Sequence, residues 1–172
     1  GLVARRRIFD HPPLGQVKSI MANENPVALP RTVAWLGYGG LIPFVVLAPA
    51  SLLDHHHGVA WSDALYAYGA IILSFVGALH WGLAMSLPGL SERQRSAWFA
   101  WSVVPALIAW PAVLFSPPQA APMLVVGFIA HYLQDRRLAS QATLPGWYLP
   151  LRLRLSCVAV VCLVAGIYAN CV

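Results

Sequence analysis

Charged side chains and cysteines are both scarce in this sequence. Charged residues make up 10% and hydrophobic residues 59% of its 172 positions, whereas soluble domains average roughly 25% charged residues. A water-soluble domain of this composition would lack its polar coat, so that class is excluded. Cys157, Cys162 and Cys171 form no C-x-x-C pair, and no histidine lies at zinc-finger spacing from them. We therefore interpret the cysteines as apolar filler and not as a redox or zinc site.

Sequence signatures of catalysis are missing as well. The chain has no G-x-S-x-G, H-E-x-x-H, P-loop or Rossmann glycine pattern. A non-enzymatic protein is therefore the stronger expectation, although an enzyme is not excluded. The net charge of +5 does not indicate nucleic acid as a partner, because the basic residues flank apolar stretches and do not form a basic stripe with interleaved aromatic residues.

Basic residues occur in three patches that alternate with pairs of apolar stretches. The patches are Arg5, Arg6, Arg7, Lys18 and Arg31; Arg93 and Arg95; and Arg136, Arg137, Arg152 and Arg154. Loops that face the cytoplasm keep their Lys and Arg, so we place all three patches on that side. The sequence therefore predicts an all-α integral membrane protein with five transmembrane helices, its N-terminus inside and its C-terminus outside.

The predicted membrane domain covers residues 32–172. Its spans are expected at about 32–53, 64–87, 97–115, 119–134 and 155–170. Residues 1–31 are polar, and we expect them to form a disordered cytoplasmic tail. The fourth span is the short one, because its 16 residues give about 24 Å of helix against a hydrocarbon core of ~30 Å. We still expect it to cross, because otherwise the last basic patch would lie on the opposite side from the others.

Small residues in the second span suggest where helices meet. Ala70, Ser74, Ala78 and Gly82 recur at every fourth position. Such small-xxx-small patterns allow membrane helices to approach closely. The pattern predicts that this stripe forms the central seam of the bundle.

Two histidines are placed inside predicted spans, near the cytoplasmic end. His80 lies in the second span and His131 in the fourth, at comparable depth, and Asp135 follows His131 by four residues. Asp135 is therefore placed to accept a hydrogen bond from His131. Ionisable residues at such depth often mark a functional site. The three residues could stabilise helix packing, contact an anionic lipid headgroup, serve a quinone or a proton relay, or ligate a b-type haem.

A second candidate site lies at the cytoplasmic end of the last two spans. It combines arginines with aromatic residues: Arg136, Arg137, Trp147, Tyr148, Arg152 and Arg154. Guanidinium groups bind phosphate, and Trp and Tyr favour the headgroup region. The group could fix topology and depth, or it could bind a phospholipid headgroup or a protein partner. No metal site is expected, since the His55, His56, His57 run lies in a loop where consecutive side chains point apart.

The same residues carry a resemblance to a known family. The segments that carry it are LGYGGLIPF at 36–44, YGAIILSF at 68–75, GALHWG at 77–82, DRR at 135–137, PGWY at 145–148, and Arg152 with Arg154. In this combination the chain resembles the family called domain of unknown function 3429, which comprises small bacterial inner-membrane proteins and also includes transmembrane protein 69. The resemblance implies a multi-pass protein of the bacterial inner (cytoplasmic) membrane, with no settled activity and no catalytic residues to carry over.

We expect such a protein to support or associate with a larger membrane complex, with the lipid bilayer and anionic phospholipid as further partners. The alternative is a redox or ligand-binding membrane protein that holds quinone, haem or anionic lipid near His80 and His131. A transporter is the third possibility, although five spans without an evident inverted repeat do not favour it.

Overall fold

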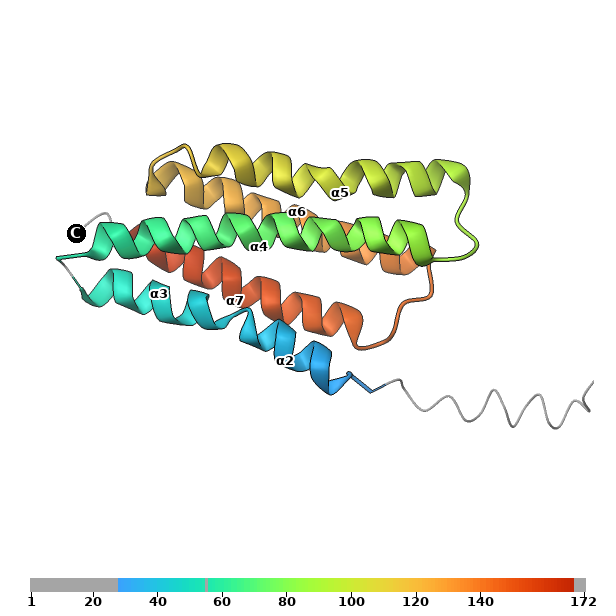
Figure 1. Ribbon diagram of the computed structural model, residues 1–172, viewed down its shortest axis with the longest axis horizontal. Coiled ribbons are helices and arrows are strands. Elements are labelled where there is room, and N and C mark those ends of the chain that lie inside the picture. The colour runs from blue at the N-terminus through green and yellow to red at the C-terminus, as the bar shows by residue number, and fades with distance from the viewer. Residues whose placement is uncertain (1–27, 55, 169–172) are drawn as a thin grey trace, which may run out of the picture.

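The computed structural model describes residues 28–54 and 56–168, and within them all regular structure is helical. The helices are α2 (Arg31–Gly39), α3 (Ile42–Leu53), α4 (Gly58–Ser86), α5 (Glu92–Ala112), α6 (Pro117–Gln141) and α7 (Tyr148–Tyr168). Because α2 and α3 follow one another along one side of the bundle, the described chain forms five rods (Figure 1). Most of the predicted tail, the end of the fifth predicted span and Cys171 lie outside the described residues.

The first rod, where the sequence predicted a span at about 32–53, consists of two helices. The break falls at Gly40 and Leu41, and Pro43 lies in the first turn of α3. Proline has no N–H to donate to the preceding turn but is well suited to the start of a helix. Pro43 therefore ends the hydrogen bonding of α2 and begins α3.

Helices α5 and α6 begin where local signals favour a start. The side chain of Ser91 accepts a hydrogen bond from the backbone N–H of Gln94, and the Gln94 side chain bonds back to Ser91, so α5 begins with a capping box. Helix α6 begins with Pro117 and Pro118, where missing N–H groups cost little. Helix α6 is also longer than predicted, because it extends through the charged residues after Gln134 to Gln141. Its 25 residues correspond to about 37 Å.

Helix α4 is the centre of the bundle and contacts α3, α5, α6 and α7. Its buried face includes Gly69, Leu73, Gly77 and His80. A Cβ atom at Gly77 would lie 2.6 Å from the backbone carbonyl oxygen of Ser102 on α5. Gly77 therefore permits the close approach of α4 and α5.

The predicted small-residue seam packs only in part. Ala70 is buried and Ser74 is half-buried, but Ala78 and Gly82 are exposed, and a Cβ at Gly82 would meet no atom within 4 Å. An α-helix has 3.6 residues per turn, so positions four apart rotate by ~40° at each step. Over three steps, from Ala70 to Gly82, the stripe therefore rotates away from the buried face of α4.

All arginines in the described part of the chain lie toward one end of the bundle. Arg31 begins α2, Arg93 and Arg95 lie in the first turn of α5, Arg136 and Arg137 lie near the end of α6, and Arg152 and Arg154 lie near the start of α7. These helix ends lie toward the right-hand end of the bundle in Figure 1. Three helical stretches within the described residues are long and apolar enough to cross a membrane: Arg31–Leu53, Gly58–Ser86 and Tyr148–Tyr168. Helices α5 and α6 carry polar turns at the basic end.

Candidate functional site

Three helices bring five polar side chains together inside the bundle. The residues are His80 on α4, His131 and Asp135 on α6, and Tyr148 and Arg152 on α7, and we call them the polar cluster. Residues four apart on a helix share a face, so α6 and α7 each present two members of the cluster. The side chains of His80, His131 and Asp135 are 0% exposed, and Arg152 is 6% exposed.

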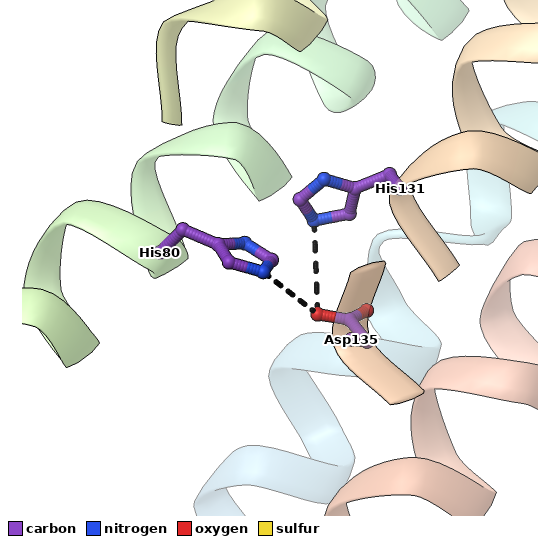
Figure 2. Close-up of side chains that lie close together, drawn as sticks. All are labelled: His80, His131 and Asp135. Carbon is purple, nitrogen blue, oxygen red and sulfur yellow. Dashed lines mark ion pairs between the residues drawn. The ribbon is translucent and has the colours of Figure 1, made fainter. Parts of the chain in front are cut away.

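The carboxylate of Asp135 is the centre of the polar cluster. Its Oδ2 accepts a hydrogen bond from Nε of Arg152 at 2.8 Å, and its Oδ1 accepts one from the Tyr148 hydroxyl at 2.9 Å. The Nε2 atoms of His80 and His131 lie 3.6 and 3.9 Å from the same Oδ1 (Figure 2). One carboxylate thus connects α6 with α7 directly and faces α4 through His80.

The predicted hydrogen bond from His131 to Asp135 is not formed, because 3.9 Å is longer than a hydrogen bond. The rings of His80 and His131 contact one another edge to face, with centroids 4.6 Å apart and an interplanar angle of 76°. Among the described residues, none of the four ring nitrogens has a hydrogen-bond partner. The carbonyl of Val76 lies beside the His131 ring but outside hydrogen-bond geometry.

This geometry bears on the ligands considered for the two histidines. A haem would need its macrocycle between two opposed imidazoles, whereas these rings touch each other directly. A quinone or a lipid headgroup would need an opening, but His80 and His131 are fully buried. The structure therefore supports none of these three ligands at the histidines.

The predicted headgroup or partner site divides into two groups of residues. Tyr148 and Arg152 belong to the polar cluster, and sequence reasoning missed their pairing with Asp135. Arg136, Arg137 and Arg154 are exposed, and Trp147 is half-buried. The exposed arginines form the basic surface at the end of α6 and the start of α7, and we call these three residues the basic surface below.

Arg95 has a role that the sequence did not indicate. Its guanidinium donates hydrogen bonds to the backbone carbonyls of Ala84 and Leu87. These carbonyls belong to the last turn and the C-cap of α4, where helices leave acceptors without a partner. Arg95 therefore joins the start of α5 to the end of α4, near the polar cluster.

The loop between α3 and α4 forms a separate polar contact around Asp54. Its carboxylate accepts a hydrogen bond from the Trp61 indole N–H at 3.1 Å and lies 3.1 Å from Nδ1 of His57. The bond from Trp61 is the main cause that holds the pKa of Asp54 below its usual value of 3.8. These contacts close the turn between α3 and α4; His55 lies outside the described residues.

Comparison with known protein families matches residues 29–168 to the family described as protein of unknown function (DUF3429). The chain belongs to this family. It is similar to transmembrane protein 69 of Xenopus tropicalis, with 38% identity over 147 residues, which cover 80% of this chain and 54% of that protein. It is also similar to transmembrane protein 69 of Mus musculus, with 28% identity over 134 residues, covering 76% of this chain and 53% of that protein.

The chain thus spans about half the length of the curated relatives that it matches. The name of these relatives and the apolar helices agree that this member of the family is a membrane protein. No solved structure matches the chain. The family description indicates no activity.

Proposed function

We propose that this family member is a non-enzymatic, five-span protein of the bacterial inner membrane that supports or associates with a larger membrane complex. The polar cluster carries the proposal. Its charged centre is closed, since Asp135, His80 and His131 are fully buried, and an active site must admit a substrate. A buried ion pair with hydrogen-bonded partners is suited to fix the relative positions of α4, α6 and α7.

The positions of the arginines support an N-in, C-out orientation. Every arginine in the described ranges lies toward the end where α2, α5 and α7 begin and where α4 and α6 end. The positive-inside rule places that end in the cytoplasm. This arrangement requires α6 to cross, and its length of about 37 Å is sufficient.

Fusions of alkaline phosphatase test this orientation, because the enzyme is active only outside the cytoplasm. We expect activity for fusions after Ser116 and after Val172, and none for fusions after Leu90 or Leu144. Activity after Leu144 would mean that α6 does not cross.

The basic surface is the part of the protein that we propose contacts the complex. Arg136 and Arg137 are exposed on α6 beside the closed cluster, so their charges are available to a partner. We expect the chain, extracted from its own membrane in mild detergent, to migrate on native gels above the size of the pure protein. The double variant Arg136→Glu, Arg137→Glu should return to the size of the pure protein.

The matched control is Arg93→Glu, which changes an exposed arginine at the same end of the bundle but on α5. Its migration should stay that of the parent protein. Migration of the parent at the size of the pure protein, or equal migration of both charge-reversal variants, would contradict the proposed association.

Anionic phospholipid is a second proposed partner of the basic surface. Arg154 is exposed, and its Nη1 lies 3.4 Å from the hydroxyl of Tyr38. Exposed arginines near a membrane surface are attracted to anionic headgroups by about 1 kcal/mol each. Thermal stability in nanodiscs should therefore be higher with phosphatidylglycerol than with phosphatidylcholine. The difference should shrink in Arg154→Gln and at high salt.

A further inference from the structure

We propose that His80, His131 and Asp135 bind a divalent transition-metal ion, Zn²⁺ or one of similar preference, as a structural ion inside the bundle. Two imidazoles and a carboxylate are a common ligand set for such ions. The site is independent of the proposed complex, because it depends only on contacts within this chain.

The donor atoms already converge. One ligand atom from each residue lies within 4.8 Å of the other two, and both Nε2 atoms face the same Oδ1 (Figure 2). Tetrahedral zinc with bonds of ~2.0–2.1 Å places its ligand atoms about 3.3 Å apart. The observed Nε2–Oδ1 separations of 3.6 and 3.9 Å would need to shorten by about 0.3–0.6 Å. The separation between the two histidine nitrogens, which lies within 4.8 Å, would need to shorten by up to about 1.5 Å.

The unpaired histidine nitrogens are a second, independent observation. Buried polar atoms nearly always have a hydrogen-bond partner, yet none of the four ring nitrogens has one within the described part of the chain. Both rings are 0% exposed, so bulk water does not hydrate them. Coordination of an ion by the two Nε2 atoms gives these two of the four nitrogens a partner that the described helices do not supply.

The remaining cluster residues would orient the carboxylate. Arg152 holds Oδ2 at 2.8 Å, which leaves Oδ1 directed at the histidines, and Tyr148 donates to Oδ1 at 2.9 Å. Such outer partners fix the direction of a metal ligand. The positive charge of Arg152 offsets the negative charge of Asp135, so a bound divalent ion would leave the site with two uncompensated positive charges. This favours an anion such as hydroxide as a fourth ligand.

The test uses the full chain in detergent, with a purification tag free of histidine and with His11, His55, His56 and His57 changed to alanine. This background removes every histidine outside the polar cluster. After treatment with a chelator, we expect the chain to take up about one Zn²⁺ per molecule and its Tm to rise with Zn²⁺. Added Co²⁺ should give the visible absorption of a tetrahedral nitrogen and oxygen site. No uptake, no Tm shift and no Co²⁺ band would overturn the proposal.

Three variants assign the ion to the cluster. In the same background, His80→Gln and His131→Gln should each lower the Zn²⁺ affinity at least ~10-fold and abolish the Co²⁺ band. Tyr148→Phe keeps all three ligands, so it should retain the stoichiometry but bind ~10-fold more weakly. If a histidine variant fails to fold, Tyr148→Phe still tests the proposal, because an unchanged Zn²⁺ affinity of Tyr148→Phe would overturn it. Unchanged Zn²⁺ binding by a folded histidine variant would overturn it too.

Discussion

Asp135→Asn should strongly weaken the bundle. It removes one charge with little change in shape, and it leaves Arg152, which is 6% exposed, without its partner at 2.8 Å. Removal of one member of a buried ion pair costs about 3–5 kcal/mol in soluble proteins. Interhelical hydrogen bonds in membranes contribute about 0.6–1.7 kcal/mol. We expect a loss of about 3 kcal/mol, because a charge and not only a hydrogen bond loses its partner.

The assay is reversible unfolding in mixed micelles with increasing dodecyl sulfate, followed by far-UV circular dichroism. Arg152→Met should cost about as much as Asp135→Asn, since it leaves the carboxylate unpaired. The double variant should lose clearly less than the sum of the two, with a coupling of about 2 kcal/mol. The control is Arg136→Gln, an exposed neighbour on α6, which should stay within about 0.5 kcal/mol of the parent.

A loss below about 1 kcal/mol for Asp135→Asn, or costs that add without coupling, would refute the reasoning. Either result would mean that the carboxylate does not hold α6 and α7 together.

Three further predictions concern other contacts. Gly77→Ala should destabilise the bundle by about 1–3 kcal/mol, because the new Cβ would lie 2.6 Å from the Ser102 carbonyl oxygen, whereas Gly82→Ala, in open space, should be neutral or stabilising in the same unfolding assay. Arg95→Ala should lower the free energy of unfolding by about 1–3 kcal/mol and increase hydrogen exchange at the end of α4, because the carbonyls of Ala84 and Leu87 lose their donor. Equal exchange in variant and parent would count against the proposed link between α5 and α4. The folded-state pKa of Asp54 is lowered, so the contact of its carboxylate with Trp61 stabilises the fold above the unfolded-state pKa and is lost as the pH falls through the folded-state pKa. The Trp61 indole N–H resonance should therefore shift with a midpoint below pH 3.8. Asp54→Asn should abolish this shift.

The helices were largely predictable from sequence because apolar stretches of membrane length are bounded by charges and turns. The differences between the expected spans and the observed helices have physical causes. The fourth span was expected at about 119–134 because three charged residues follow. Helix α6 continues beyond it to Gln141, because its hydrogen bonds persist where the Asp135 carboxylate faces partners and Arg136 and Arg137 are exposed. The hydropathy of the first rod is continuous and predicts one span, and the break within it lies just before Pro43, a residue type that tends to interrupt a helix.

The sequence predicted that His80 and His131 lie at the same level of the bundle, but it did not predict which residues contact Asp135. The common depth of His80 and His131 followed from two helices of the same direction, and the two rings do meet. Arg152 and Tyr148 were assigned to the membrane surface because residues near the end of a span usually lie there. Their contact with Asp135 depends on the rotation of α7 about its axis, which the spacing within one helix does not determine.

The ion pair between Asp135 and Arg152 also has a consequence for how the chain enters the membrane. The carboxylate lies on α6 and its guanidinium partner on α7, so during synthesis the acid emerges first. A lone Asp costs about 2.5–3.5 kcal/mol at the centre of an inserting helix, and less near its end. In the proposed five-span arrangement, α6 and α7 are therefore expected to insert together as a hairpin, with α6 completing its insertion only after Arg152 has left the ribosome.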